Sequence, residues 1–545
     1  MMLNLKKIHL KSIFTIGLFV FYPFLVLFIF GWFVIPYAKE YLKEIIAFGL
    51  LSLVFFNCIL IIPKVKIRKW LLLLFTIVLS VLIFIKISFY HHYGVKISAS
   101  ALFVIFETNA VEATDFLSNY VNYFTIVLLL LLLNPYLLYF VKSIRVFFQK
   151  SLQENLSFSI LKIVALLLIP ISLYLIHLKF QDKNIVLTSY YTYEDFLSTK
   201  KLLKKNIAQK HSKIIKVDSF NKSPQIHVVI IGESTSKWHM QLYGYSRETN
   251  PLLTEIEDEL IVFKDVITPH VHTINALEKI LTLSNFNDPN KKENASVVQL
   301  SNQAGYTTYW LSNQRPVGLH ESTASLISGG ADFKYFLSSN DYMFNIYDEN
   351  ILPKLDDIIL EKKEKKIIFI HLIGTHSGYD NRYPESYSYF NGVRENQKFT
   401  HEKAISLTNE YDNSVRYNDF IVREIIEKIR KTNTNSYVMY FSDHGDDIFD
   451  VYNDIAGHNE YHGTSPMYEI PFIVWASESY KNNHPKFEFL KKNRFKKYNL
   501  EHFIHSFSEI SDIKFNLFQP TNSIFNSHFK ETKRIIKNGE DYDAR

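Results

Sequence analysis

The sequence has very little cysteine, and it lacks the features of several common classes of protein. One cysteine, Cys58, stands among 545 residues, so no disulfide can form within the chain. The net charge at pH 7 is only +6, and the C-terminal half has no dense basic run. Nucleic-acid binding therefore has little support. Internal repeats and low-complexity tracts are also missing. What the chain has instead is apolar sequence, most of it in the first third.

Five apolar runs occupy that first third, each close to the roughly 20 residues that a helix needs to cross a bilayer. They are residues 15–36, 45–63, 70–90, 121–141 and 156–178. The only charged residue in the third run is Lys86, and the only one in the fifth is Lys162. Each is near an end of its run, from which a lysine can reach the headgroups. The first run is too long for a signal-peptide core and lacks a small-residue cleavage site, so we expect it to be retained. The sequence predicts a five-helix transmembrane domain over residues 1–179.

Basic residues gather at one set of span ends. These ends carry Lys6, Lys7, Lys11, Lys64, Lys66, Arg68, Lys69, Lys142, Arg145 and Lys150, whereas the opposite ends carry only Lys39, Lys43 and Lys96. Cytoplasmic loops are enriched in lysine and arginine, so the N-terminus is predicted to be cytoplasmic. An odd number of spans then places the rest of the chain outside. In a Gram-negative cell this means a multi-pass protein of the inner membrane with its C-terminal domain in the periplasm.

Two polar segments adjoin the predicted spans. The outer loop after the third span carries Asn109 and Glu112, whose groups would suit an ammonium-bearing lipid headgroup, although an ordinary solvated loop has the same composition. Within residues 180–224, Tyr190, Tyr191 and Tyr193 are followed by a group of lysines at positions 200, 201, 204 and 205. Aromatic rings at headgroup depth beside basic groups are typical of an interfacial segment, with a plain solvated linker as the alternative.

From residue 225 onward, short apolar runs alternate with amphipathic ones. The pattern is typical of strands at 227–231, 307–311, 367–372, 437–441 and 472–475, and of helices at 274–283 and 418–429. Strand–helix alternation predicts a soluble α/β domain over residues 225–545, with a mostly parallel central sheet.

Acidic side chains and an imidazole follow two of these strands directly. Asp443 and His444 come after 437–441, and Glu233 comes after 227–231. Ligands bind at the carboxyl ends of strands in open α/β sheets, so these side chains are candidates for one site. Two carboxylates and an imidazole suit zinc, and suit manganese less well. The alternative for Asp443 and His444 is a polar surface turn.

Thr273 lies directly before the helical run at 274–283. A threonine there is commonly an N-cap. A helix N-terminus also attracts anions, and a hydroxyl at the fourth position of a zinc ion loses its proton near neutral pH and becomes a nucleophile. Ser234 and Thr235 are rival hydroxyls beside Glu233.

Four more histidines are candidates for binding phosphate oxygens or for the core. His376 and His458 lie in loops, and His462 competes with His458 for the same role. Each could bind phosphoryl oxygens or a second metal, or simply lie at the surface. His371, inside an apolar strand, is predicted to be a hydrogen-bonded core residue.

Several motifs together resemble the membrane-bound phosphoethanolamine transferases of the alkaline phosphatase/sulfatase superfamily. The motifs are the polar loop at Glu107–Glu112, IGEST at Ile231–Thr235, YGYSRETNP at Tyr243–Pro251, HTINALEKILT at His272–Thr282, GTH at Gly374–His376, YDNSVRYND at Tyr411–Asp419, SDHGDD at Ser442–Asp447 and GHN at Gly457–Asn459 ahead of Glu469-Ile470-Pro471. The resemblance covers nearly the whole chain and implies a five-span helical domain followed by an α/β domain of alkaline phosphatase/sulfatase type.

The resemblance also implies a chemistry. Thr273 would be the nucleophile and would hold one Zn²⁺ together with Glu233, Asp443 and His444, with a second zinc ion allowed. His376 and His458, the latter preferred over His462 by its spacing to Ile470, would bind the phosphoryl group or that second ion. In the outer loop, Asn109 and Glu112 would bind the headgroup of the donor.

The reaction implied is transfer of phosphoethanolamine from phosphatidylethanolamine, through a phospho-threonine, to lipopolysaccharide core or lipid A. We expect a monomer that contacts membrane lipids and no nucleic acid. The chain lacks the soluble-domain disulfides common among relatives and the Cys/Ser-x-Pro-x-Arg sequence of true sulfatases. A glycerol-phosphate transferase or phosphodiesterase with the same metal core is the alternative, followed by a non-catalytic membrane sensor.

Overall fold

The computed structural model divides into two compact units. It describes residues 2–35, 38–93, 121–139, 146, 159–180, 185–287, 294–314, 323–337, 347–453, 455–484, 487–537 and 539–545. The first unit contains the N-terminal helices, and the second contains Asp195–Arg545. Asn109 and Glu112 lie outside the described residues, so their predicted role stays a prediction.

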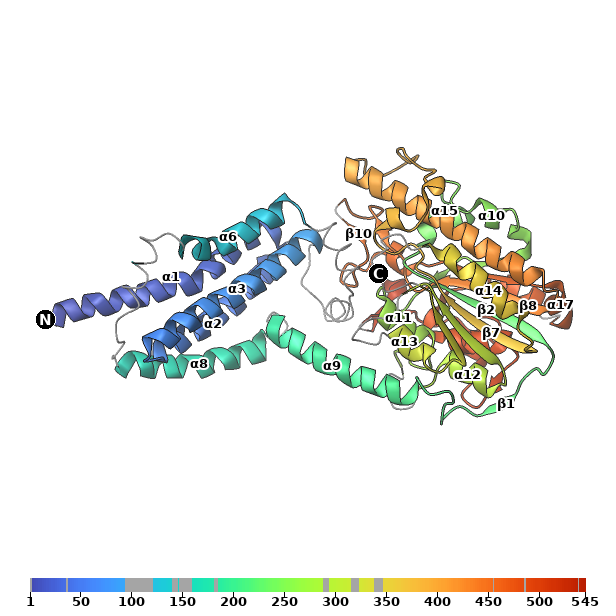
Figure 1. Ribbon diagram of the computed structural model, residues 1–545, viewed down its shortest axis with the longest axis horizontal. Helices are drawn as coiled ribbons and strands as arrows, with labels where there is room; N and C mark the ends of the chain where they lie inside the picture. The colour runs from blue at the N-terminus through green and yellow to red at the C-terminus, as the bar shows by residue number, and fades with distance from the viewer. Residues whose placement is uncertain are drawn as a thin grey trace. The chain divides into compact units, whose positions relative to one another are not determined.

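Long apolar helices make up the first unit (Figure 1). They are α1 (Met2–Val34), α2 (Ala38–Ile61), α3 (Val65–Tyr93), α6 (Tyr123–Tyr139) and α8 (Ser159–Lys179). Within the described ranges, four helical segments are long and apolar enough to cross a membrane: Ile13–Val34, Ala38–Ile61, Val65–His91 and Lys162–Lys179. The predicted span at 121–141 falls on α6, whose apolar stretch, Tyr123–Leu137, is shorter.

A buried ion pair joins α2 to α3 inside this apolar unit. The Lys86 Nζ lies 2.5 Å from the Glu44 Oε2, and the two side chains are 3% and 0% exposed. The Tyr90 hydroxyl donates to the other Glu44 oxygen at 3.0 Å. The expectation that Lys86 reaches toward the headgroups is therefore wrong, because an inward-facing carboxylate on the neighbouring helix neutralises it.

The predicted polar linker contains regular structure. Helix α9 (Ile185–Asn206) fills much of it, and a short strand, β1 (Val217–Ser219), follows. Tyr190, Tyr191 and Tyr193 on α9 are exposed. Exposed tyrosines are compatible with the interfacial role, which stays a prediction.

A seven-stranded sheet forms the centre of the second unit. Its order is β3 (Leu260–Phe263), β11 (Phe472–Ala476), β8 (Asn435–Ser442), β2 (Gln225–Gly232), β7 (Lys365–His371), β5 (Thr307–Ser312) and β6 (Phe333–Phe336). The pairings from β8 through β6 are parallel, while β11 runs antiparallel to both β8 and β3. All five predicted strands are present, and β3 and β6 are additional.

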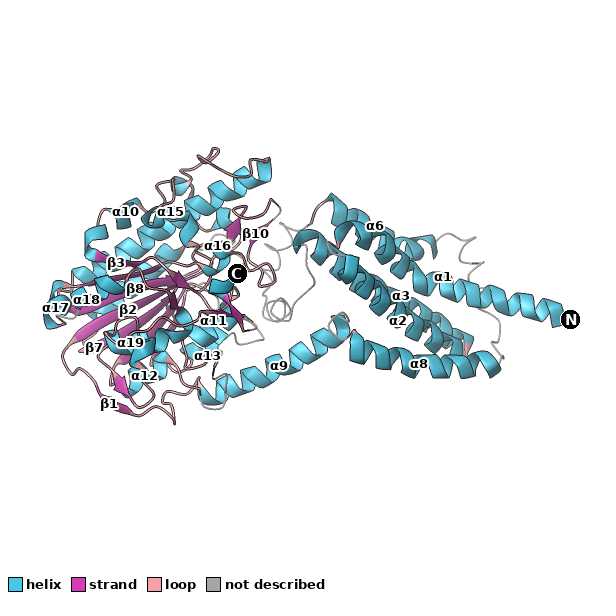
Figure 2. Ribbon diagram, turned by 180° about the vertical axis from the view of Figure 1, so that it is seen from behind, coloured by secondary structure: helices cyan, strands magenta, loops and turns pink. Residues whose placement is uncertain are grey.

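Helices cover both faces of this sheet (Figure 2). Strand side chains alternate between the faces, so Val228 and Ile230 pack on one side and Val229 and Ile231 on the other. The first side is covered by α10 (Pro251–Thr254), α14 (Ile351–Leu360) and α15 (Glu402–Arg430). The second is covered by α11 (Thr273–Ile280), α12 (Val297–Gln303), α13 (Thr323–Ser328), α17 (Glu478–Asn483), α18 (Phe487–Asn493) and α19 (Phe503–Ile510). A sheet buried on both faces explains why its strands read as continuous apolar runs.

Short elements complete the second unit. They are β4 (Val266–Ile267), β9 (Asp447–Ile448), β10 (Ala456–Gly457), α16 (Ser465–Tyr468), β12 (Tyr498–Asn499), β13 (Lys514–Phe515), β14 (Ile535–Ile536) and β15 (Glu540–Asp541). Strands β9 and β10 pair as an antiparallel hairpin directly after the end of β8.

The carboxyl ends of the parallel strands meet at one edge. Gly232 of β2 is in register with Ser442 of β8, and His371 of β7 is in register with both Ile231 and Ser312. The residues that follow these strands therefore emerge side by side.

Candidate metal centre and active site

Four side chains predicted to form a site converge at this edge of the sheet. The Thr273 Oγ1 lies 3.1 and 3.2 Å from the two carboxylate oxygens of Glu233 and 3.4 Å from the His444 Nε2. The same His444 nitrogen lies 3.1 Å from the Glu233 Oε1 and 3.6 Å from the Asp443 Oδ2. Glu233 and Asp443 come together because their strands, β2 and β8, are parallel neighbours in register.

Two glycines allow the backbone to approach closely here. A Cβ on Gly232 would lie 2.9 Å from the Tyr440 ring, and one on Gly445 would lie 2.3 Å from the Pro466 carbonyl oxygen. The backbone turns after β2 at Ser234, whose φ is 59°. This strained backbone directs the Ser234 amide to the Asp443 Oδ1 at 3.2 Å.

Thr273 is the first residue of α11, and His272 before it is the N-cap. The threonine side chain is thus free of a capping role and faces the Glu233 carboxylate. The rival hydroxyls differ from it in exposure: Ser234 and Thr235 are completely buried, whereas Thr273 is partly exposed. Thr235 also contacts the Thr375 hydroxyl at 3.2 Å.

Burial and charge shift the ionisation of the three acidic and basic groups. Burial and the neighbouring Glu233 charge raise the pKa of Asp443 to about 8. Burial works against the charge on His444 as well, but the Asp443 and Glu233 carboxylates raise its pKa to about 10. Burial also disfavours the Glu233 charge, and the hydrogen bond with His444 and its charge outweigh this and lower the Glu233 pKa. Two buried carboxylates thus share one cationic partner.

The donor set fits a divalent cation. One ligand atom each from Glu233, Asp443 and His444 lies within 4.8 Å of the others, and all three side chains are buried. The Asp443 Oδ2 is buried with no hydrogen-bond partner among the described residues. A buried, unsatisfied carboxylate oxygen is costly unless a positive charge meets it. Two carboxylates, one imidazole and a hydroxyl are a set that suits zinc.

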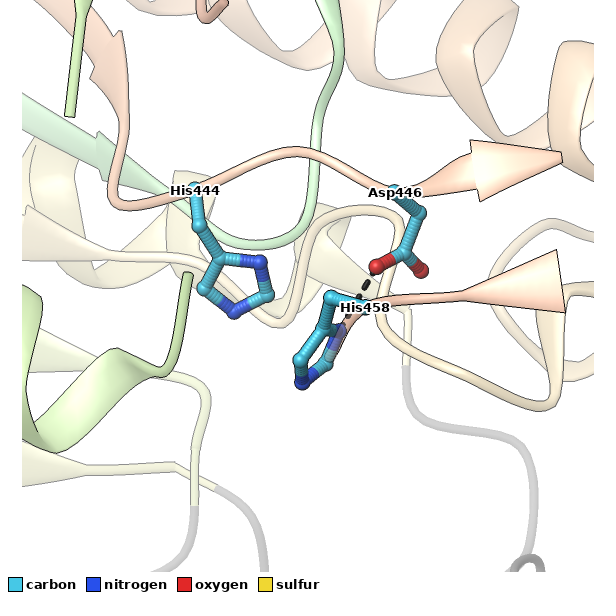
Figure 3. Close-up of side chains that lie close together, drawn as sticks. All are labelled: His444, Asp446 and His458. Carbon is cyan, nitrogen blue, oxygen red and sulfur yellow. Dashed lines mark hydrogen bonds and ion pairs between the residues drawn. The ribbon is translucent and has the colours of Figure 1, made fainter. Parts of the chain in front are cut away.

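A second group of possible ligands lies beside the first. His444, Asp446 and His458 also bring one ligand atom each within 4.8 Å of the others (Figure 3). The His458 Nδ1 lies 2.7 Å from the Asp446 Oδ1. The His458 ring lies 4.1 Å from the His444 ring and 5.2 Å from the His272 ring, between centroids.

The remaining predicted histidines lie in different surroundings. His376 is close enough to Glu233 and His458 to interact with both electrostatically, and burial lowers its pKa to about 4. His462 packs instead against the exposed rings of Tyr452 and Tyr461. His371 is buried as predicted, but its Nε2 has no hydrogen-bond partner among the described residues.

Sequence reasoning did not assign three residues at this site. The Gln314 Nε2 donates to the Glu233 Oε2 at 3.0 Å and to the Leu372 carbonyl at 2.9 Å. Gln314 follows β5, and a polar residue after a parallel strand was the available signal. Asp446 lies within the same motif as Asp443. His272 is 5% exposed with both ring nitrogens unpartnered among the described residues, and only its adjacency to Thr273 marked it.

The chain is similar to several known proteins. The sulfatase family matches residues 225–513. Phosphoethanolamine transferase EptC of Escherichia coli O18:K1:H7 is 33% identical over 473 residues, covering 83% of this chain and 82% of that protein.

Two solved structures are similar as well. The C-terminal periplasmic domain of E. coli EptC, crystallised in complex with zinc, has a TM-score of 0.57 and 34% identity, covering 60% of this chain and 95% of that one. The integral membrane protein lipooligosaccharide phosphoethanolamine transferase A of Neisseria meningitidis covers 94% of this chain and 97% of its own, with a TM-score of 0.68 and 20% identity. That likeness shows that the fold is shared along nearly the whole chain. The chain belongs to the membrane-bound phosphoethanolamine transferases of the alkaline phosphatase/sulfatase superfamily.

Proposed function

We propose that this protein transfers phosphoethanolamine from phosphatidylethanolamine to lipopolysaccharide core or lipid A, through a phospho-threonine at Thr273. The observation that carries the proposal is the position of the Thr273 hydroxyl, within 3.1–3.4 Å of Glu233 and His444 and partly exposed. Relatives of this chain are named phosphoethanolamine transferases.

Glu233, Asp443, His444 and Thr273 would hold one Zn²⁺, and the His444–Asp446–His458 group leaves room for a second ion. Bound there, zinc supplies positive charge that lowers the pKa of a hydroxyl and offsets negative charge on phosphoryl oxygens. The Glu233 and His444 side chains orient the Thr273 oxygen, which lies at the positive end of α11.

The transfer has two steps. In the first, the Thr273 Oγ1 forms a bond to the phosphorus of the donor, and the bond to the glycerol oxygen breaks, which releases diacylglycerol with the proton that the threonine loses. In the second, an acceptor oxygen bonds to phosphorus and the threonine hydroxyl is restored. Positioning and charge stabilisation, which His376 and His458 would supply with the metal ligands, are most of what phosphoryl transfer requires.

The location follows from the charge bias of the span ends. The N-terminus would be cytoplasmic, and the soluble domain, residues 225–545, would lie in the periplasm beside its lipid donor. The helical domain at 1–179 and the segment at 180–224 would keep the monomer at the inner membrane, and Asn109 and Glu112 would bind the donor headgroup. Proximity to the lipid surface raises the effective concentration of the donor.

Intact-protein mass spectrometry tests this assignment. Full-length protein in phosphatidylethanolamine-containing nanodiscs is expected to acquire the mass of one phosphoethanolamine, located on Thr273 by peptide mapping. Thr273→Ala should abolish the adduct, whereas Thr235→Ala, which removes a fully buried hydroxyl, should retain it. An adduct on Ser234 or Thr235 would reassign the nucleophile. A glycerol-phosphate adduct would identify the alternative transferase with the same metal core.

A further inference from the structure

Asp446 lies between the turn that carries Asp443 and His444 and the β9–β10 hairpin. It follows the Asp443-His444 turn and precedes β9, and the β9–β10 hairpin pairs Asp447 with Gly457. The residues just beyond that pair, Asp446 and His458, therefore lie side by side at the open end of the hairpin. Gly457 adopts a φ of 105°, which favours glycine at the turn into His458.

Both oxygens of the Asp446 carboxylate are engaged. The Oδ1 lies 2.7 Å from the His458 Nδ1, and the Oδ2 accepts from the Tyr379 hydroxyl at 2.7 Å. Tyr379 is buried and packs edge-on against Tyr411, whose hydroxyl donates to the Ser234 carbonyl. The carboxylate is therefore fixed from the side opposite His458 by a chain of buried aromatic residues that leads back to the end of β2.

This arrangement determines how His458 presents itself. A carboxylate offers only acceptors, so the His458 Nδ1 is the donor in the pair and the neutral ring carries its lone pair on Nε2. Figure 3 shows Nδ1 turned to Asp446, with the other ring nitrogen on the far side of the ring. Asp446 is 1% exposed and His458 22%, so the accessible part of the pair belongs to the imidazole.

We infer that Asp446, held by Tyr379, is a positioning residue that fixes His458 with its Nε2 lone pair available to the incoming acceptor hydroxyl. The inference rests on the proposed function. A hydrogen bond from the acceptor O–H to Nε2 aims the acceptor oxygen at the phosphorus of phospho-Thr273. The acceptor oxygen–phosphorus bond forms, the bond from phosphorus to Thr273 Oγ1 breaks, and the proton given up by the acceptor restores the threonine hydroxyl.

The arrangement favours the second half of the reaction over the first. Attack by Thr273 on the lipid needs no external hydroxyl, whereas discharge to an acceptor or to water does. Removing the orientation of His458 should therefore slow discharge more than it slows formation of the phospho-threonine, in which His458 supplies charge stabilisation but orients no incoming acceptor. A residue that merely supported the fold would change both steps together.

The experiment follows the two half-reactions in the full-length, zinc-loaded protein. Adduct formation is timed by intact mass spectrometry after mixing with phosphatidylethanolamine vesicles. Discharge is timed after transfer into phosphatidylcholine nanodiscs, with water alone and then with purified lipopolysaccharide. For Asp446→Asn, we expect adduct formation within about threefold of wild type and discharge at least about tenfold slower, the scale of effect seen when a side chain that orients another is lost. An asparagine presents an amide N–H to one of its two partners, which disturbs either the Nδ1–H tautomer or the Tyr379 contact.

Matched variants isolate the carboxylate. Asp446→Glu retains two acceptor oxygens and should restore faster discharge than Asp446→Asn. Asp447→Asn changes the adjacent buried carboxyl, whose Oδ1 accepts from the Asp450 amide at 2.8 Å rather than from a histidine, and should discharge like wild type. Tyr379→Phe removes one hydroxyl and should give a smaller delay than Asp446→Asn.

The outcomes separate this inference from the proposed function. Absence of any adduct in the wild type would contradict both the proposed function and this inference. A normal adduct with wild-type discharge in Asp446→Asn defeats the inference alone. Equal slowing of both half-reactions would make Asp446 a structural residue, and loss of a zinc equivalent from Asp446→Asn would make it a ligand. Either result overturns the positioning role.

Discussion

Two buried clusters in the second unit each contain one histidine and two carboxylates. They differ in how completely their polar atoms are paired. In the first, the His239 Nδ1 lies 2.6 Å from Asp412 and its Nε2 lies 3.0 Å from Asp450. Arg247 reaches the second Asp412 oxygen at 2.7 Å. In the second cluster, a single nitrogen of His444 faces both Glu233 and Asp443, and the Asp443 Oδ2 has no hydrogen-bond partner among the described residues.

The difference distinguishes a network whose polar groups are satisfied within the fold from one whose polar groups are not. The His239 cluster joins the loop after β2, helix α15 and the segment after β9, and its polar groups are paired within the fold. The Glu233–Asp443–His444 group is held rigidly but left short of positive charge. Buried carboxylates that the fold does not neutralise mark a place for a cation, and the partly exposed Thr273 beside them marks a place for chemistry.

The largest expected effect comes from Asp443→Asn. An asparagine can keep the Oδ1 contacts to the amides of Ser234 and His444 but cannot neutralise a cation. Zinc binding should weaken at least about 100-fold, at the upper end of what changes near metal sites produce, and the phospho-threonine should not form. Zinc content by mass spectrometry and the adduct assay measure both.

The same variant has an internal control. Without zinc, the free energy of unfolding of Asp443→Asn should lie within about 1 kcal/mol of that of the metal-free wild type, because the substitution removes a carboxyl whose charge burial disfavours. A large loss of stability in the metal-free variant would contradict the assignment of this cluster as incomplete without a cation.

Asp412→Asn should produce the reverse pattern. It breaks a completely buried carboxylate away from His239, Tyr245 and Arg247. Removing one member of a buried charge network typically costs about 3–5 kcal/mol of unfolding free energy. Denaturant unfolding should show this loss, while the protein that remains folded retains its zinc. Loss of zinc with unchanged stability would abolish the distinction between the clusters.

Gln314→Ala tests how strongly the metal centre depends on a residue that contacts one of its ligands. The variant removes the amide that donates to the Glu233 Oε2, and it leaves the carboxylate itself in place. Zinc affinity should fall by about 10- to 100-fold, with little change in the unfolding of the metal-free protein. Competition with a chromogenic chelator measures the affinity. An unchanged value would show that the other contacts of Glu233, with His444, Thr273 and the Ser234 hydroxyl, are sufficient to orient it.

Alkaline pH should weaken the structural cluster gradually. Burial disfavours the charge on His239, but Asp450 and Asp412 outweigh it and raise the histidine pKa to about 9. Since the ordinary value is 6.5, this stabilisation is complete below pH 6.5 and is lost as the pH rises through about 9. Melting temperatures of the metal-free protein across that range should fall more steeply than those of His239→Gln. Parallel curves would mean that the network does not require the charged imidazole.

The sequence was informative where local pattern and topology agree. Strands β2 and β8 are continuous apolar runs, and because each ends directly before an acidic residue, their parallel pairing brings Glu233 and Asp443 together. The position of Thr273 could not be derived in the same way. Its helix begins on a different segment, so its approach to Glu233 depends on how α11 packs on the sheet.

Contacts between segments far apart in the chain could not be predicted from the sequence, for the same reason. Asp412 and Asp450 are far from His239 along the chain, and ordinary helical and turn patterns surround them. The pairing of Asp446 with His458 depends on the register of a hairpin whose two strands are only two residues long. Strands β3 and β6 are only four residues long, and although the LIVF run of β3 is typical of a strand, neither was predicted.

The Lys86–Glu44 pair has a consequence for biogenesis. A lone charge in a spanning helix raises the free energy of insertion, by up to about 2.5–3.5 kcal/mol at the helix centre and by less toward the ends, where Glu44 and Lys86 lie. Helices α2 and α3 are separated by three residues, and each carries one of the two opposite charges. Entering the lipid together, as a helical hairpin with the charges already joined, avoids placing either charge alone in hydrocarbon. We therefore expect the translocation machinery to release α2 and α3 as one unit, and a chain with Glu44→Gln to insert α3 less efficiently.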